Sequence, residues 1–338
     1  MRAPGSAVPV RLFALAILAA CGSKAEPVPG PDAGQAMTVE LGIRPFLQNA
    51  PVFIALEEGY FADEGLDVRV HVLSGHSATS LVLLEHGDLD VVTGSIFLGL
   101  FNAINAGSLI RVVADKGYLE ARGCSPYALV ARRQIAATHR TPGSLDGLRI
   151  DVNPSLAEGY FVETWLARDG LSLEDLDVRS IPLASRPDAM NRGLIDLSAT
   201  SEPWLSRLLS DGHEVILGAA EIVPGLQYGL LLFGPGLLGD RREAGRRFIA
   251  GYLRGVEQYN RGKTPRNIEI LSRALELDPA TLERACWVSV RDDGMIETDG
   301  MQEFQRWGLE KGLVDRVIDP EEYWDPSFVT EAAGRAAR

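Results

Sequence analysis

Polar and aromatic residues that could contact a small molecule occur in loops placed after stretches expected to be strands. Arg44 is the best of them for a charged group, because it directly follows a strand expected over residues 37–43. In open α/β sheets, ligands bind beyond the carboxyl ends of strands, where helix N-termini present unpaired N–H groups that favour oxyanions. The candidate ligand-binding residues in or near such loops are Arg44, Phe46, Gln48, Asn49, Gly75, His76, Ser77, Gly94, Ser95, Asp115, Asn153, Ser155, Glu158, Glu202, Trp204 and Tyr228.

Each of these candidates also has an ordinary structural explanation. Ser77 and Ser155 can act as helix N-caps, and Gly75 and Gly94 can simply permit turns. Trp204 can either stack on a flat ligand or belong to the core. The sequence leaves both explanations open.

The charge of the ligand is also left open by these residues. Arg44 and the helix N-termini favour an oxyanion, whereas Asp115, Glu158 and Glu202 would repel one or accept a hydrogen bond from an amine or a ring nitrogen. Aromatic side chains near the same loops offer surface for a planar compound; they are Phe46, Phe97, Tyr160, Trp204 and Tyr228. We expect a small organic ligand with at least one aromatic or apolar face.

Nothing in the sequence requires catalysis. The histidines His71, His76, His86, His139 and His213 show no metal-ligand spacing such as i, i+4 on a helix. The sequence also contains no Gly-x-Ser-x-Gly nucleophile elbow, no phosphate-cradling Gly-x-x-x-x-Gly-Lys and no paired-cysteine motif. We therefore predict no catalytic residue, no metal and no cofactor.

An internal repeat shows which elements must position these loops. Residues 60–70 resemble residues 165–171 together with 176–179, and residues 85–95 resemble residues 191–201. A repeat with a period of this length indicates two whole α/β lobes rather than a solenoid. Two lobes that face each other form a cleft, and clefts at domain interfaces bind small molecules.

The order of expected elements supports two lobes. Strands alternate with helices, which predicts mostly parallel sheets with right-handed crossovers. The expected strands are 37–43, 68–73, 89–92 and 110–114 in the first lobe and 127–131, 148–152, 178–182 and 195–199 in the second, with 229–233 as the return connection. We expect an α/β fold of two similar Rossmann-like lobes, in which lobe 1 comprises 37–122 and 236–335 and lobe 2 comprises 123–235. An apolar stripe formed by Phe248, Tyr252, Val256 and Tyr259 predicts C-terminal helices that pack on the first lobe.

The N-terminal segment predicts export. Residues 1–20 carry two arginines and a short apolar run, and they end in Leu18-Ala19-Ala20-Cys21, which has the form of a bacterial lipobox. We expect a lipoprotein signal peptide over 1–20, lipid on Cys21 and a flexible tether over 21–36 that is rich in Pro, Gly and Ala. An ordinary secretory signal is the alternative. The expected location is the periplasmic face of a bacterial membrane.

Composition excludes some partners. Removing residues 1–20 leaves 31 of the 33 basic residues against all 46 acidic ones, so the net charge changes from −13 to −15. Such an acidic chain is a poor candidate for binding nucleic acid. Beyond Cys21, the cysteines Cys124 and Cys286 are far apart, and we favour two buried thiols over a disulfide.

Several of these segments resemble one known family. Residues 57–68, Gly87-Asp88-Leu89-Asp90, residues 145–150 and Ser201-Glu202-Pro203-Trp204 are similar to segments of the nitrate/sulfonate/taurine and thiamine-pyrimidine-precursor solute-binding proteins of ABC importers. The resemblance covers about residues 38–330. It implies a type II periplasmic-binding-protein fold, a monomer whose lobes close by hinge bending, and delivery of one ligand to a membrane permease.

The chain also departs from that family. Its loop Gln48-Asn49-Ala50-Pro51 lacks the histidine that the family commonly has before Ala-Pro, which puts the family's usual ligand in doubt. Two alternatives remain beside the importer. One is an enzyme on the same bilobal scaffold, of the pyrimidine-precursor or menaquinone-pathway type, and the other is a ligand-binding subunit of a non-ABC transport or sensor system.

Overall fold

The first of two five-stranded sheets is built mainly from the first third of the chain. The computed structural model describes residues 36–73 and 77–336. The signal peptide, Cys21, the tether up to residue 35, Gly75 and His76 lie outside these residues. The strand order of the first sheet is β2-β1-β3-β10-β4, with β1 at Met37–Ile43, β2 at Leu66–Val72, β3 at Val91–Ser95, β4 at Arg111–Tyr118 and β10 at Gln227–Phe233.

The second sheet repeats this arrangement with later residues. Its order is β7-β6-β8-β5-β9, with β5 at Tyr127–Ala131, β6 at Arg149–Asp151, β7 at Asp177–Arg179, β8 at Leu197–Ser201 and β9 at Glu214–Gly218. In each sheet the fourth strand, β10 or β5, is antiparallel to both neighbours, and the other four strands run in one direction. The prediction of two similar lobes with mainly parallel sheets is therefore confirmed.

One part of the expected lobe boundary is wrong. The boundary at residue 235 assigned 229–233 to the second lobe, but β10 pairs with β3 and β4 in the first sheet. The sequence could not show this pairing, because β3 and β10 lie far apart along the chain. By sheet membership, we propose that the chain leaves the first lobe through residues 119–126 and returns through residues 219–226.

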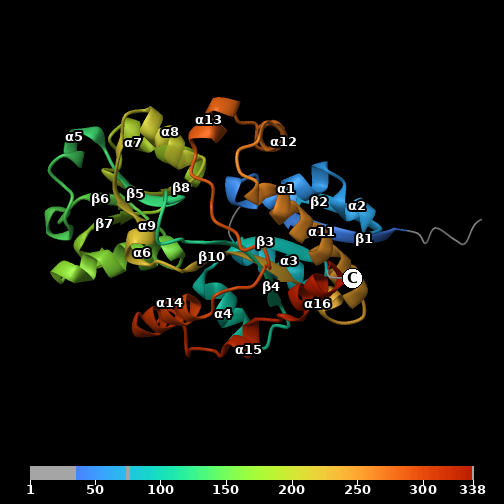
Figure 1. Cartoon of the computed structure of the whole chain (residues 1–338). Helices are drawn as coiled ribbons and strands as arrows, with labels where there is room; N and C mark the ends of the chain where they lie inside the picture. Colours follow the sequence, from blue (N-terminus) through green and yellow to red (C-terminus); the bar gives the residue numbers. More distant parts are fainter. Residues whose placement is uncertain (1–35, 74–76, 337–338) are drawn as a thin grey trace, which may run out of the picture. The chain divides into compact units, whose positions relative to one another are not determined.

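Helices connect the strands within each lobe (Figure 1). α1 begins with Pro51 in its first turn, a position where the fixed φ of proline suits a helix start. Gly59, at φ 75°, follows α1 in the left-handed region that favours glycine. The helices up to β10 are α1 at Ala50–Glu57, α2 at Tyr60–Asp63, α3 at Ser77–His86, α4 at Leu98–Asn105, α5 at Arg133–Ala136, α6 at Ala157–Leu166, α7 at Arg186–Asn191, α8 at Trp204–Ser210 and α9 at Ala219–Ile222, with a 3-10 turn, η1, at Leu47–Asn49.

The C-terminal region is helical and packs mainly on the first lobe. Phe248, Tyr252, Val256 and Tyr259 of α11 are all buried, and α11 contacts α1, α2 and α16. α14 contacts both α4 of the first lobe and α6 of the second (Figure 1). These helices are α10 at Pro235–Leu238, α11 at Arg242–Asn260, α12 at Pro265–Leu275, α13 at Pro279–Arg284, α14 at Asp299–Glu310, α15 at Pro320–Tyr323 and α16 at Ser327–Ala336.

Three segments run side by side where the chain passes between the sheets. Leu119 exchanges backbone hydrogen bonds with Gly225 and Leu226, and Tyr118 donates to Ser289 O at 3.0 Å. Cys124 forms a disulfide with Cys286, with Cα atoms 5.7 Å apart. The expectation of two separate thiols is thus wrong, because the fold brings together cysteines that are 162 residues apart in sequence. None of the described helices is long and apolar enough to cross a membrane.

Candidate ligand-binding site

The loop after β1 is organised by its own polar groups. Asn49 Nδ2 donates to the Arg44 carbonyl at 2.7 Å, and this bond closes the turn that leads into α1. Arg44 is half-buried and donates from Nη2 to Ser80 Oγ of α3 at 3.1 Å. Burial lowers the pKa of the Arg44 guanidinium. This arginine therefore lies at the carboxyl edge of the first sheet, as the sequence predicts.

Polar side chains from both lobes meet beside this loop. Gln48 Nε2 donates to Ser95 Oγ at 3.2 Å, which joins η1 to the end of β3. The Tyr228 hydroxyl of β10 lies near Ser95 and near Ser201 of the second lobe, and both side chains act to lower its pKa. Burial raises the pKa of Tyr228, so its hydroxyl is neutral at physiological pH. Four polar side chains of the two lobes, Gln48, Ser95, Ser201 and Tyr228, thus lie near one another.

A small cavity lies at this junction. It is lined by Leu47, Gln48, Pro126, Ser201, Glu202, Tyr228, Cys286 and Val288. Its volume of about 10 Å³ gives space for about one water molecule, since a water needs roughly 10–15 Å³. Gln48, Glu202 and Tyr228 were candidates from the sequence, whereas Ser201 was not. A larger ligand needs the two lobes to separate.

Direct contacts between the lobes surround this cavity. Phe46 packs edge-on against Trp204 of α8, with ring centroids 4.9 Å apart. Phe97 forms an isolated β-bridge with Leu156, and Leu98 N donates to the Ser155 carbonyl at 3.2 Å. Phe46, Trp204 and Ser155 therefore lie where the lobes touch. In this conformation Phe46 and Trp204 contact each other.

Glu158, which the sequence predicts to contact the ligand, has its carboxylate hydrogen-bonded to groups of the second lobe. Its Oε2 accepts from the Tyr127 hydroxyl at 2.8 Å and from Arg186 Nη1 at 3.2 Å. Its Oε1 accepts from Asn153 N at 2.6 Å, and Arg186 Nε lies 2.6 Å from Asp151 Oδ2. These groups are buried or nearly so, and the arginine compensates two carboxylates. Glu158 thus stabilises the loop before α6 rather than facing a ligand.

The other two candidate acids also have protein partners. Asp115 is fully buried and accepts from Gly117 N and Gln227 Nε2, each at 2.6 Å, and from Arg291 N at 2.7 Å. Glu202 accepts from Ser206 and from Cys286 N. Burial raises the pKa of both carboxyls. The expected repulsion of an anion by these acids is therefore much weaker than the sequence suggested.

The remaining described candidates are not among the residues that line the cavity. Gly94 lies within β3, where a Cβ would meet Leu232 at 3.4 Å. Asn153 Oδ1 accepts from Ser155 N at 3.0 Å. Ser155 is not the N-cap of α6, because Leu156 occupies that position. Ser77 is the first residue of α3, and its side chain lies outside the described part of the structure.

Lys116 is a residue that the sequence analysis missed. It lies on β4 next to Asp115, is fully buried, and its Nζ has no hydrogen-bond partner among the described residues. Burial lowers its pKa to about 7, and the nearby Arg44 charge acts in the same direction. A lysine within an otherwise buried strand would have indicated an unusual residue. The strand expected from the sequence ended at residue 114, so Lys116 lay outside it.

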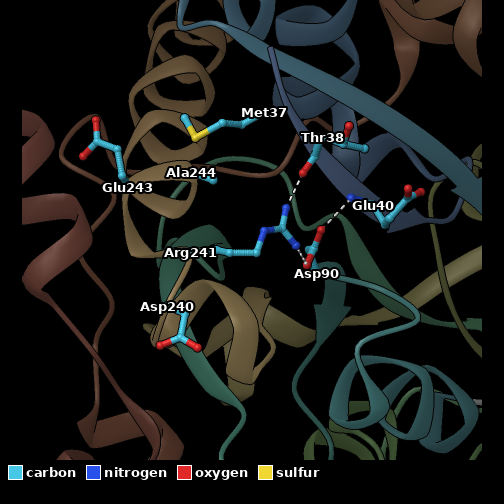
Figure 2. A pocket seen from close by; sticks show the side chains of 8 residues that line it. All are labelled: Met37, Thr38, Glu40, Asp90, Asp240, Arg241, Glu243 and Ala244. Carbon is cyan, nitrogen blue, oxygen red and sulfur yellow. Dashed lines mark hydrogen bonds and ion pairs between the residues drawn. The ribbon is translucent and has the colours of Figure 1, made fainter. Parts of the chain in front are cut away.

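A larger hollow lies elsewhere, at the amino end of β1 (Figure 2). Its volume is about 500 Å³, and Met37, Thr38, Glu40, Asp90, Asp240, Arg241, Glu243 and Ala244 line it. Figure 2 shows that Arg241 is directed at Asp90 and Thr38, and its Nη1 lies 2.6 Å from Asp90 Oδ1. The first turn of α11 lines this hollow, but the hollow lies at the amino ends of the strands, whereas open α/β sheets bind ligands beyond the carboxyl ends. The interlobe cavity is therefore the better candidate.

A family model agrees with this geometry. The model of the NMT1-like family matches residues 32–224, which is more than half of the chain. The chain belongs to the NMT1-like family. The bicarbonate-binding protein CmpA of Synechococcus elongatus is 23% identical over 208 residues, which covers 53% of this chain and 44% of CmpA. The match thus spans less than half the length of that relative.

Solved structures with low sequence identity have the same fold. The ligand-binding component of an ABC-type import system from Staphylococcus aureus has a TM-score of 0.74 at 14% identity, covering 88% of this chain and 99% of that one. The alkanesulfonate-binding protein SsuA from Xanthomonas axonopodis pv. citri, bound to MOPS, has a TM-score of 0.70 at 18% identity, covering 86% and 99%. The predicted resemblance and the predicted two-lobed fold of importer binding proteins are confirmed.

Proposed function

We propose that this protein is the solute-binding component of an ABC importer and captures a small anion between its two lobes. The observation that carries the proposal is the interlobe cavity, to which η1 and β10 of the first lobe and β8 of the second contribute polar groups. A site shared by two lobes favours the closed conformation when it is occupied, because the ligand contacts both lobes only there.

The distribution of charge favours an anion over a cation. Asp115, Glu158 and Glu202 already accept hydrogen bonds from protein groups. Arg44 and Lys116 bring positive charge to the same edge of the first sheet. The relatives point the same way, since CmpA is named for bicarbonate and SsuA for alkanesulfonate. Within this class, we propose a sulfonate-like or similarly small oxyanion and place an aromatic compound second.

We further propose which residues contact the ligand. Gln48, Ser95, Ser201 and Tyr228 offer hydrogen bonds at the cavity, and Phe46 and Trp204 offer apolar surface where the lobes meet. In this proposal the Gln48–Ser95 hydrogen bond is exchanged for bonds to the anion. Glu158 and Asp115 do not contact the ligand in this proposal and instead stabilise the protein segments that they bind.

The proposed cellular role requires export and a partner. A lipobox at Leu18-Ala19-Ala20-Cys21 supports lipid attachment at Cys21 on the periplasmic side of a membrane. We propose that the monomeric protein delivers its ligand from there to a membrane permease. Mass spectrometry of the purified protein would show cleavage before Cys21 and a diacylglyceryl mass on it. A mature protein cut elsewhere and without lipid would exclude anchoring.

Calorimetry and small-angle scattering test the binding function together. The panel contains nitrate, bicarbonate, methanesulfonate and taurine, with cytosine and riboflavin as planar compounds that carry no anionic group. We expect one of the anions to bind at micromolar or tighter concentrations and to reduce the radius of gyration. Binding that leaves the radius unchanged would contradict closure, and binding of the planar compounds alone would contradict the anion. Turnover of any panel compound would favour the enzyme alternative.

A further inference from the structure

Lys116 is a buried cation for which the described protein provides no counter-charge in contact. Its side chain is fully buried in the first lobe, and its Nζ has no hydrogen-bond partner within residues 36–73 and 77–336. A buried ammonium without partners is destabilising, and proteins normally pair such groups. Asp115, the adjacent acid, is held by Gly117, Gln227 and Arg291 instead.

The groups around Lys116 do not compensate its charge fully. On its own strand, Asp115 favours the charged form, while Arg44 at the end of β1 opposes it. Around β4, η1 offers the neutral Asn49, and Tyr252 of α11 donates its hydroxyl to the Asp115 carbonyl. The charged Arg291 lies 3.9 Å from the Asp115 carboxylate. These groups leave the positive charges of Lys116 and Arg44 near each other at one edge of the first sheet.

The backbone of Lys116 lies beside residues that line the interlobe cavity. Its neighbour Gly117 lies against Val288, which lines the cavity, because a Cβ on Gly117 would meet Val288 Cγ2 at 2.7 Å. The Lys116 carbonyl lies against Gly229, the residue after the cavity-lining Tyr228. η1, which supplies Leu47 and Gln48 to the cavity, also contacts β4. The flexible four-carbon stem of a lysine lets its ammonium reach an adjoining space.

We propose that Lys116 is the anion-binding residue at the base of the cleft, and that the bound oxyanion is its counter-ion. The inference rests on the proposed function and deepens it by naming the group that recognises the charge. Arg44 acts from the same edge, so both cations favour a compact oxyanion over a neutral solute. Opening of the lobes gives the anion access, and closure brings it against the ammonium.

A structural lysine is the competing explanation. Asn49 Oδ1 and Thr93 Oγ1 are buried acceptors without partners among the described residues, and a rearranged Lys116 could donate to one of them. In that case the ammonium stabilises the fold, and replacing it lowers the melting temperature. Replacing a lysine that binds a ligand has the opposite effect on the melting temperature. An apolar side chain of similar length removes an uncompensated charge, so the melting temperature is raised or preserved.

Proton linkage gives a readout that a structural role does not produce. With a pKa of about 7, Lys116 is mostly neutral at pH 8 when no anion is bound. An anion in contact with the ammonium raises that pKa, so binding at pH 8 takes up about one proton. Affinity for the anion therefore falls as the pH rises above 7.

The experiment compares the full-length protein with Lys116→Met and with Lys24→Met as a control. Lys24 lies in the segment expected to be a tether, so the control makes the same change in charge away from the fold. Nitrate, bicarbonate and methanesulfonate are titrated by calorimetry at pH 6.5 and 8 in two buffers of different ionisation enthalpy. The melting temperature of each protein is measured without added anion.

We expect Lys116→Met to weaken anion binding by at least about tenfold, to abolish proton uptake and to raise or preserve the melting temperature. Lys24→Met should bind as the unsubstituted protein does. Equal anion affinity in Lys116→Met and in the unsubstituted protein overturns the role of Lys116. A lower melting temperature of Lys116→Met, together with no proton uptake by the unsubstituted protein, overturns it too. Both results leave the proposed function standing. Failure of the unsubstituted protein to bind any of these three anions or taurine overturns both.

Discussion

At the scale of single residues, His213 shows how hydrogen bonds select one protonation state. The Arg133 N–H donates to His213 Nδ1 at 3.3 Å, so Nε2 carries the proton and faces Asn191 Oδ1 at 2.9 Å. Burial is the largest cause that lowers the pKa of His213. A second proton on Nδ1 would oppose the Arg133 N–H. The folded protein therefore favours the neutral imidazole.

This preference predicts a loss of stability in mild acid. The unfolded chain binds a proton at His213 below a pH of about 6.5, whereas the folded protein resists it, so stability falls as the pH decreases from 7 to 5. His213→Gln keeps a donor and an acceptor but cannot titrate, and we expect it to reduce this fall. Melting temperatures at several pH values provide the measurement, with His86→Gln as a control. An identical pH profile in His213→Gln and in the unsubstituted protein would refute the assignment.

We expect the buried charge of Arg186 to make a large contribution to the stability of the protein. Its guanidinium lies 2.6 Å from Asp151 and 3.2 Å from Glu158, and all three side chains are buried. Arg186→Met leaves both carboxylates without a cation, which we expect to reduce the free energy of unfolding by about 3–5 kcal/mol. Arg207→Met removes an exposed arginine paired with Asp211 and should change it by less than about 1 kcal/mol. Urea denaturation measures both, and similar losses would argue against a special role for Arg186.

At the scale of elements, the contact between α1 and α11 depends on a residue without a side chain. A Cβ at Gly255 would lie 2.3 Å from the Pro51 carbonyl oxygen and 2.9 Å from Ala55 Cβ. The first of these atoms is backbone and cannot move without shifting α1. The close approach of the two helices positions η1, which directly precedes α1.

Gly255→Ala should therefore destabilise the protein. Alanine in a helix interior is favoured over glycine by about 1 kcal/mol, but overpacking of a tight contact costs about 1–3 kcal/mol. Because the obstructing atom is a backbone oxygen, we expect a net loss. Gly334→Ala in α16 is the matched control, since a Cβ there meets no atom within 4 Å. Thermal denaturation decides the sign, and a stabilised Gly255→Ala protein would show that the helices separate easily.

At the scale of the whole molecule, the Cys124–Cys286 bond joins parts of the chain that lie 162 residues apart. A cross-link of this kind restricts the unfolded chain, and such bonds typically contribute about 2–4 kcal/mol. We expect Cys124→Ser with Cys286→Ser to lower the free energy of unfolding by about that amount in urea denaturation. A reducing agent should have the same effect on the unsubstituted protein and none on the double variant. Insensitivity of both proteins would mean that the two thiols are not bonded.

The sequence predicted local elements better than their partners. β1 at Met37–Ile43 and β5 at Tyr127–Ala131 have the predicted bounds, because an alternating pattern and a short apolar run mark them. β9 was missed, since Glu214–Gly218 is short and only partly apolar. The sheet to which β10 belongs was assigned wrongly, because pairing across more than a hundred residues leaves no local pattern.

The candidate site was predicted in the same uneven way. Gln48, Glu202 and Tyr228 were named from the sequence and line the cavity. Ser201 was named only as part of the segment Ser201-Glu202-Pro203-Trp204, and Lys116 was not named, because its importance depends on what covers it. A lysine in a strand is usually exposed, but Lys116 is fully buried by the elements that pack around β4. Burial by distant segments is the property that sequence patterns show least.

The strand order of the two sheets has a consequence for how the chain assembles as it leaves the ribosome or the export machinery. The second sheet is continuous from Tyr127 to Gly218, whereas the first remains incomplete until β10 appears after Gln227 to fill the gap between β3 and β4. Contacts over long separations form slowly, so the second sheet should form before the first, although β1 to β4 precede it in the chain. The first sheet then stays incomplete until β10 is available, at a time when the second sheet has already formed.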